Sequence, residues 1–202
     1  MGNLSQFLGI EVYRDTTGLY LNQAKYATDL LKKFGYENLK PSLTPMATGK
    51  LISKAEGQVL KNPTLYRSAI GGLQYLAYTR SDITYLVNKM SQFLQTPTDA
   101  HWKALKRVFR YLKGTLKHGL VIRKSDNLDI IVFADSDWAS CPDERRSTAG
   151  YCVYLGDNLV SWCSKKQHVV ARSSTEAEYR ALAHCASEIT WIQSLMKELK
   201  IP

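Results

Sequence analysis

Two acidic motifs, about forty residues apart, constrain the fold of this chain most strongly. The first, A-D-S-D-W-A-S at 134–140, directly follows an apolar run at 130–133, which predicts a buried strand that ends in carboxylates. The second, S-S-T-E-A-E-Y-R-A at 173–181, opens a long amphipathic helix. A strand-end Asp and a helical Glu that face each other suit a two-metal phosphodiester-cleaving site, because acids from separate elements must converge on the ions.

Asp135 is the candidate metal ligand of the first motif. Asp135 and Asp137 share one face of the predicted strand, because side chains alternate along a strand. Two carboxylates at the end of a buried strand are costly unless a cation or hydrogen-bond donors meet them. The alternative is that both acids simply begin an exposed loop.

Glu178 is the candidate ligand of the second motif, because it lies one turn before Leu182 on the apolar face of the predicted helix. Glu176 lies about 200° round the helix from Glu178, so it points away and complements the helix dipole. An inward Glu178 needs a partner, which a metal shared with Asp135 or a salt bridge to Arg or Lys would supply. The expected inward stripe comprises Leu182, Cys185, Ile189, Ile192, Met196 and Leu199.

Charge divides the chain into a basic and a mildly acidic part. Residues 1–126 contain 19 Lys and Arg against 8 Asp and Glu, whereas residues 127–202 contain 8 against 10. The basic part favours contact with a polyanion. The cations concentrate on one face of a helix that follows Pro97, which is either a phosphate-contacting face or an ordinary solvated surface. The candidate phosphate contacts are Lys103, Lys106, Arg107, Arg110 and Lys113.

Periodicity and turn residues predict the other elements. The opposite face of the basic helix carries the apolar stripe Trp102, Leu105, Phe109 and Leu112, and residues 37–62 form a poorly patterned connector. A change of pattern near 125–127 marks a domain boundary. We expect a hairpin at 7–21, helices at 22–34, 63–79, 81–94 and 98–114, strands at 128–135, 148–156 and 159–170, and a helix at 174–200.

Other features exclude several classes of protein. No apolar run approaches the roughly 20 residues of a membrane span, and no signal-peptide pattern occurs, so we expect neither a membrane protein nor a secreted one. The four cysteines are spaced by 11, 11 and 22 residues without a C-x-x-C motif, which predicts free thiols in a reducing compartment. The four histidines show no ligand spacing with them, so no zinc site is expected.

Several motifs occur in the order found in one family. F-L-G-I-E-V, T-P-M, L-Y-R-S-A-I-G-G-L-Q-Y-L, T-R-S-D-I and H-W-K-A-L-K-R-V-F-R-Y-L-K-G-T resemble the C-terminal part of a copia-type LTR retrotransposon reverse transcriptase. A-D-S-D-W-A-S, D-E-R-R-S-T-A-G-Y, S-W-C-S-K-K-Q and S-S-T-E-A-E-Y-R-A-L resemble the N-terminal part of the ribonuclease H that follows it in the Pol polyprotein. The resemblance covers essentially the whole chain.

The resemblance implies an α+β fold with two parts. Residues 1–125 would form a hairpin and a helical thumb/connection-like region that clasps a primer–template duplex. Residues 127–202 would form an incomplete ribonuclease H-like β-β-β-α unit. In the family this domain binds Mg²⁺ or Mn²⁺ and cuts the RNA strand of RNA/DNA hybrids by two-metal catalysis. By position, Asp135 matches the family's first-strand Asp and Glu178 its first-helix Glu.

The resemblance also implies nucleic acid and the remaining Pol segments as partners, in cytoplasmic virus-like particles or the nucleus. Both active sites are expected to be incomplete, because the polymerase's Tyr-x-Asp-Asp turn is absent and the later ribonuclease H carboxylates would follow Pro202. We therefore expect a fragment that binds nucleic acid without efficient catalysis. The alternatives are a non-enzymatic nucleic-acid-binding module and an interaction module whose sheet a partner strand completes.

Overall fold

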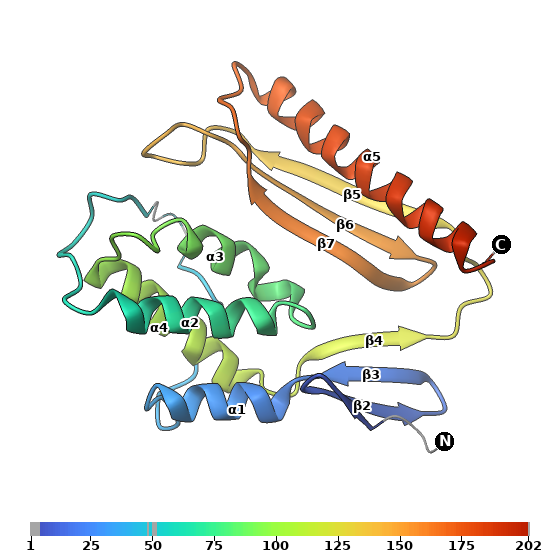
Figure 1. The fold of residues 1–202 in the computed structure, drawn as a ribbon, viewed down its shortest axis with the longest axis horizontal. Coiled ribbons are helices and arrows are strands. Elements are labelled where there is room, and N and C mark those ends of the chain that lie inside the picture. Colours follow the sequence, from blue (N-terminus) through green and yellow to red (C-terminus); the bar gives the residue numbers. More distant parts are fainter. Residues whose placement is uncertain (1–4, 48, 50–51, 202) are drawn as a thin grey trace. The chain divides into compact units, whose positions relative to one another are not determined.

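The computed structural model describes residues 5–47, 49 and 52–201. The chain divides into two compact units, Met1–Lys124 and Ser125–Pro202. The described residues form an α+β structure with five helices and two antiparallel sheets, one sheet in each unit (Figure 1). None of the helices in this part of the chain has both the length and the apolarity that a membrane-spanning segment requires.

The first unit contains a four-stranded sheet built on the predicted hairpin. The hairpin is confirmed, and Gly18 at its turn has a φ of 149°, a positive value that glycine adopts readily. A fourth strand, which the sequence did not predict, follows the last helix of the unit and pairs with the second arm of the hairpin. The strands lie in the order β1 (Gln6–Phe7), β2 (Ile10–Asp15), β3 (Gly18–Asn22) and β4 (Gly119–Arg123).

Four helices follow the hairpin, close to the predicted ranges. They are α1 (Ala24–Lys33), α2 (Pro63–Leu76), α3 (Ser81–Ser91) and α4 (Asp99–Gly114). Asn62 caps α2 by accepting a hydrogen bond from the amide of Thr64, and Thr98 caps α4. The α4 cap is reciprocal, because the side chain of His101 accepts a hydrogen bond from the amide of Thr98 at 3.0 Å.

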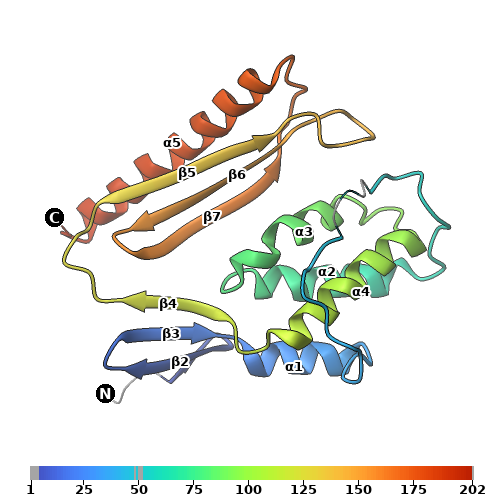
Figure 2. The same ribbon diagram turned by 180° about the vertical axis from the view of Figure 1, so that it is seen from behind.

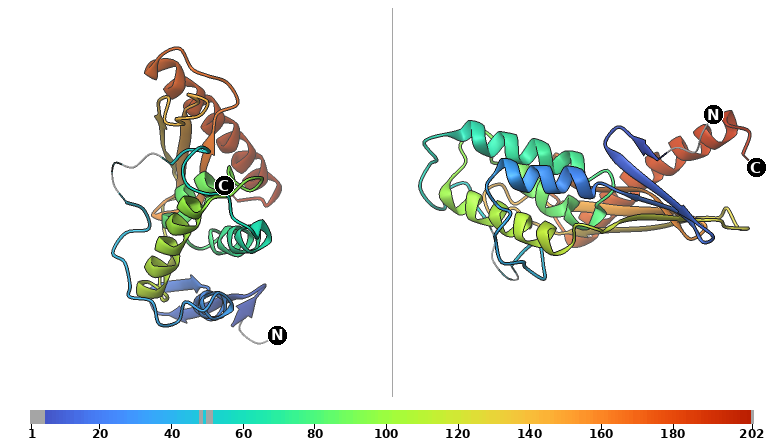
Figure 3. Two further views of the ribbon diagram at one scale, coloured as in Figure 1. Left: turned by 90° about the vertical axis from the view of Figure 1, so that its left-hand side faces the viewer. Right: turned by 90° about the horizontal axis from the view of Figure 1, so that it is seen from below.

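The core of the first unit lies between these helices. The predicted apolar stripe of α4 is confirmed, since Leu105, Phe109 and Leu112 are fully buried and Trp102 is half-buried. Seen from below, α1 lies between α2 and α4 (Figure 3, right). The hydroxyl of the buried Tyr66 donates to the carbonyl of Met90 at 2.8 Å, so the phenol oxygen in the centre of this core has a partner.

A buried arginine joins the start of α3 to the end of α4. Arg80 donates to both carboxylate oxygens of Asp82, at 2.9 and 2.8 Å, and to the carbonyl of Thr115 at 2.9 Å. Burial by itself would raise the pKa of Asp82, but the hydrogen bonds and charge of Arg80, together with the Tyr111 hydroxyl, lower it below its ordinary value. The Arg80 side chain is 3% exposed, so its hydrogen bonds link the two helix ends inside the unit.

The second unit is a three-stranded meander covered by one helix. The strands β5 (Ile130–Asp137), β6 (Thr148–Leu155) and β7 (Asn158–Lys166) pair in that order. The helix α5 (Ser174–Glu198) lies along one face of the sheet, against β5 and β6 (Figures 1 and 2). The third strand ends four residues earlier than predicted, at Lys166 rather than at 170.

The inward face of α5 agrees with the prediction only in part: Cys185 and Ile192 are buried as expected. Leu182 and Leu199, which the sequence placed inward, are 53% and 61% exposed. The buried positions of the helix are Ala177, Ala181, Cys185 and Ile192. Two alanines occupy the contact because small side chains let the helix backbone approach the sheet closely, whereas the pattern of large apolar residues suggested a different centre for the stripe.

Gly119 tests the pairing of β4 with β3. A Cβ at Gly119 would collide with the carbonyl oxygen of Leu21, which is backbone and cannot move aside. We expect Gly119→Ala to lower the free energy of unfolding by about 1–3 kcal/mol in urea denaturation followed by circular dichroism. The matched control is Gly71→Ala in α2, where a Cβ would meet no neighbouring atom within 4 Å. Helix propensity predicts that this substitution raises the free energy of unfolding by up to about 1 kcal/mol. Equal effects of the two substitutions on the free energy of unfolding would contradict the close pairing of β4 with β3 at Gly119.

Candidate nucleic-acid interface and carboxylate site

The five predicted phosphate contacts of α4 divide into exposed lysines and partly buried side chains. Lys103 and Lys106 are exposed, whereas Arg107, Arg110 and Lys113 are half-buried. The Nζ of Lys106 lies 5.6 Å from the ring centroid of Tyr36, close enough for a cation–π contact. Within the described residues, Lys103 and Lys113 form no ion pair, so their charges remain open to an anionic ligand.

Arg107 and Arg110 hold the connector (residues 37–62) against α4. Arg107 donates from Nε to the carbonyl of Thr44 at 3.2 Å and from Nη2 to the Thr44 hydroxyl at 2.8 Å. Arg110 donates from Nε to the carbonyl of Lys40 at 2.7 Å. These arginines therefore have a structural role that the sequence did not reveal. Because a guanidinium has five N–H donors, such bonds do not exhaust its capacity to bind a phosphate.

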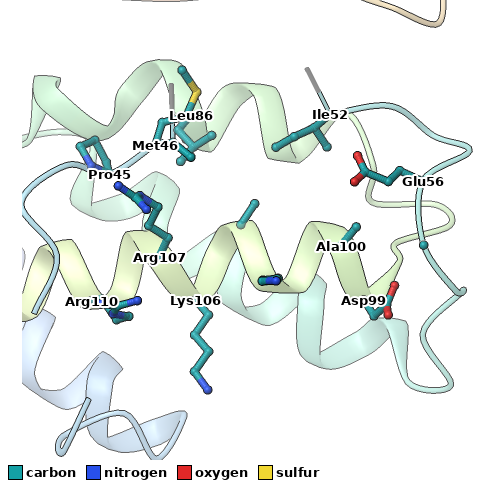
Figure 4. Close-up of a pocket in the computed structure, with 14 residues that line it drawn as sticks. Pro45, Met46, Ile52, Glu56, Leu86, Asp99, Ala100, Lys106, Arg107 and Arg110 are labelled. Atoms are coloured by element: carbon teal, nitrogen blue, oxygen red, sulfur yellow. The ribbon is translucent and has the colours of Figure 1, made fainter. Parts of the chain in front are cut away.

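A pocket of about 760 Å³ lies between α4 and the connector. Its lining combines apolar side chains, among them Met46 and Leu86, with two acids and with four cations of α4. The charged residues are Glu56, Asp99, Lys103, Lys106, Arg107 and Arg110. Figure 4 shows Arg107 pointing toward Pro45 and Met46, whereas Lys106 extends in the opposite direction. Asp99 lies at the other end of the pocket, where it accepts a hydrogen bond from the amide of Gln58 at 2.8 Å. The connector thus forms one wall of a pocket in which cations outnumber acids.

Asp135 lies near the C-terminal end of β5, as predicted, and its carboxylate is exposed. It shares the exposed face of the strand with Phe133 and Asp137. Its partner across the sheet is Gly150, so no opposing side chain covers the carboxylate. One carboxylate oxygen accepts a hydrogen bond from the amide of Ser136 at 2.8 Å. This arrangement leaves Asp135 accessible to an external ligand.

Glu178 lies in the second turn of α5, and its side chain is exposed rather than inward-facing. At 100° per residue, Glu178 lies within about 20° of Ile189 and Met196, which are half-buried. It therefore occupies the flank of the buried stripe, and the prediction that it needs an internal partner was wrong. Glu176 lies in the first turn, where the amide of Arg172 and the side chain of Arg180 lower its pKa.

Gln167 connects the two acidic motifs, a role that the sequence did not indicate. Its Nε2 donates to the carbonyl of Ala177 at 2.8 Å and to the hydroxyl of Ser136 at 3.3 Å. These acceptors immediately precede Glu178 and immediately follow Asp135. The end of β5 and the start of α5 lie at the same end of the unit (Figures 1 and 2). The motif S-W-C-S-K-K-Q could have indicated this contact only through knowledge of the fold.

Comparison with known proteins identifies the family. The retrovirus-related Pol polyprotein from transposon RE2 of Arabidopsis thaliana is 50% identical over 98% of this chain, which covers 14% of that protein. The Pol polyprotein from transposon TNT 1-94 of Nicotiana tabacum is 37% identical over 98% of the chain and is covered to 16%. The uncharacterized mitochondrial protein AtMg00810 of Arabidopsis thaliana is 48% identical over 95% of the chain and is covered to 79%.

This chain belongs to the retrovirus-related Pol polyproteins of copia-type transposons. It spans about one seventh of the length of the RE2 polyprotein. No protein-family model matches the chain. No solved structure matches it either.

The carboxylates of this Pol-family chain do not by themselves fit a two-ion centre. The described residues contain no group of three or more His, Cys, Asp or Glu side chains placed to hold a metal ion. Two divalent ions held about 3.5–4 Å apart require several carboxylates from separate elements. Asp135 and Glu178, both exposed, amount to two of the carboxylates that such a centre requires.

Removing the hydrogen bonds from Arg107 to Thr44 should weaken the docking of the connector against α4 in this Pol-family chain. The amide of Ser42 donates to the carbonyl of Arg110 at 3.2 Å and reports on connector docking. We expect Arg107→Gln to accelerate hydrogen exchange of the Ser42 amide about tenfold, which corresponds to a loss of about 1.4 kcal/mol. Lys103→Gln, which removes the same charge from the same helix without a connector contact, should leave that rate unchanged. Unchanged exchange in both variants would contradict the structural role of Arg107.

Proposed function

We propose that this chain is a nucleic-acid-binding segment of a copia-type Pol polyprotein. The segment spans the C-terminal part of the reverse transcriptase and the first part of a ribonuclease H-like domain. The observation that carries the proposal is the set of five cations on α4, a helix whose one acidic residue is Asp99 in the first turn, in a chain that belongs to this family. The ligand is an RNA/DNA hybrid or another nucleic-acid duplex, and the other Pol segments are its protein partners.

The chemistry of the α4 face suits backbone contact. Lysines on a helix act as point charges for phosphates and read no base sequence, so the expected binding is insensitive to sequence. Neutralising phosphates releases condensed counterions, which makes such binding strongly dependent on salt. Lys103 and Lys106 are the best candidates, because both are exposed. Lys113, Arg107 and Arg110 would add positive charge to α4 while the arginines continue to hold the connector.

Asp135 and Glu178 form the second part of the proposal. We assign them as two of the carboxylates of the divalent-metal site of the parent ribonuclease H. When bound, Mg²⁺ or Mn²⁺ would supply Lewis-acid activation of water and stabilisation of the leaving oxygen. The contribution of this chain would be to present one carboxylate from β5 and one from α5 at the same end of the unit, with Gln167 maintaining their relative positions. Reverse transcription and hybrid hydrolysis belong to the parent polyprotein.

Binding of a fluorescent RNA/DNA hybrid, measured by anisotropy at several salt concentrations, tests the α4 interface. We expect the double substitution Lys103→Gln and Lys106→Gln to weaken binding several-fold. We also expect it to reduce the slope of log affinity against log salt by about 2, since each lysine neutralises one phosphate. The matched control Lys61→Gln removes an exposed charge from the same unit outside α4 and should have little effect. Affinity for the hybrid that does not depend on salt would overturn the proposal that α4 contacts phosphates.

The carboxylate assignment is tested with an end-labelled hybrid in Mn²⁺ or Mg²⁺, analysed on native and denaturing gels beside Asp135→Asn and Glu178→Gln. We expect the chain to shift the hybrid without efficient cleavage, because loss of a charge-stabilising group commonly costs more than a factor of about 10² in rate. Mn²⁺ should broaden amide NMR signals near both carboxylates, and each substitution should diminish that broadening. Uniform broadening in all three proteins would reject the assignment, and cleavage abolished by either substitution would mean that two carboxylates suffice.

A further inference from the structure

A second hollow, in the net acidic unit, has a lining suited to an anion. We call it the β7–α5 pocket. It has a volume of about 240 Å³ and lies between the end of β7 and the first turns of α5. Lys165, Lys166 and His168 line it from the strand side, and Arg180 and His184 line it from the helix. Among the described residues, no carboxylate lines the pocket, although unit 2 as a whole carries more acids than bases.

Two of these cations are already paired with acids, and Glu188, one helical turn after His184, accepts a hydrogen bond from the hydroxyl of Ser161 at 2.7 Å. Glu144 binds Lys166 at 3.0 Å, and Glu176 binds Arg180 at 2.9 Å. Within the described residues, Lys165 forms no ion pair, so its charge is not compensated by a neighbouring carboxylate. The pocket therefore has an excess of positive charge and imidazole N–H donors, which favours an anionic ligand.

Neighbouring contacts hold the helix-borne groups in place. Arg180 donates to one oxygen of Glu176 from both Nε and Nη2, at 3.1 and 2.9 Å. The ring of His184 lies 5.6 Å from that of Tyr151, measured between centroids. Lys165 is opposite Ala149 in the sheet, so no large side chain competes for its space. Because Arg180 and His184 are positioned before any ligand arrives, their part in binding would require less loss of side-chain entropy.

We propose that the β7–α5 pocket binds a backbone phosphate of nucleic acid. Ammonium, guanidinium and imidazole groups that converge from two elements match the several acceptor oxygens of a phosphodiester. This inference deepens the proposed function and rests on it. It places a nucleic-acid contact in unit 2, where the net charge of the sequence gave no reason to expect one. The pocket also includes Gln167 in its lining, so the phosphate would bind beside the link between the two acidic motifs.

Inorganic phosphate is the first probe. The ¹⁵N-labelled full chain is titrated with phosphate at constant ionic strength, with chloride as the exchanged anion. We expect saturable amide shifts confined to the segments 165–169 and 180–184. Shifts that grow linearly without saturation, or that scatter over the whole chain, would overturn the proposal.

Hybrid binding by anisotropy is the second measurement. Lys165→Gln should weaken binding by about 3- to 10-fold and reduce the magnitude of the salt slope by about 1. His184→Gln provides an independent variant, since it alters the exposed helix side of the pocket. The matched control is Lys200→Gln, which removes one charge from the same unit beyond the end of α5 and should change the affinity less than about 2-fold. Thermal unfolding of each variant verifies that the fold is retained.

The two proposals fail in different ways. If Lys165→Gln weakens hybrid binding no more than Lys200→Gln, while Lys103→Gln with Lys106→Gln does weaken it, the pocket proposal is wrong and the α4 interface stands. If the unsubstituted chain does not bind the hybrid at all, the proposed function is wrong, and saturable phosphate binding would then reduce the pocket to a site for free phosphate. A contact with a backbone phosphate is supported only if phosphate causes amide shifts confined to the pocket segments and Lys165→Gln specifically lowers the affinity for the hybrid.

Discussion

Burial of one face of α4 is the constraint on which the first unit depends. Leu105, Phe109 and Leu112 are fully buried, so this helix contributes a continuous apolar face to the core. Burying each such side chain contributes about 1.5–3 kcal/mol relative to exposure. The orientation that buries these residues also determines what lies on the other faces: it turns Lys103 and Lys106 outward and brings Arg107 and Arg110 to the connector. The orientation of α4 about its own axis therefore determines both the core and the candidate interface.

The basic residues of the chain therefore serve different purposes that their charge does not distinguish. Arg80 is buried and braces α3 against the end of α4, and Arg107 fixes the connector through Thr44. Lys166 and Arg180 are each paired with a glutamate. The cations that remain without a carboxylate partner among the described residues, such as Lys103 and Lys165, are those that we assign to phosphate. Geometry, not the number of charges, selects them.

The acidic motifs illustrate the same dependence on three-dimensional context. The apolar run before Asp135 predicts a strand correctly, and the alternation of Asp135 and Asp137 on one face is confirmed. The orientation of Glu178 was predicted incorrectly, because the sheet packs against Ala177 and Ala181 and not against the larger Leu182. Gln167 then connects the two motifs through hydrogen bonds between residues that are 10 and 31 positions apart in sequence. Such a long-range polar contact has no periodic signature.

The sequence by itself determined the local structure: the hairpin, the helices, the three strands of the second unit and the family. Each of these follows from periodicity, capping residues or motifs within a short window. The tertiary structure alone decided that β4 completes the first sheet, that α5 presents its alanines to β5 and β6, and that two pockets gather cations. These features depend on residues distant in sequence, such as Leu21 and Gly119, and on steric fit. The local pattern of side chains indicates neither the long-range contacts nor the steric fit.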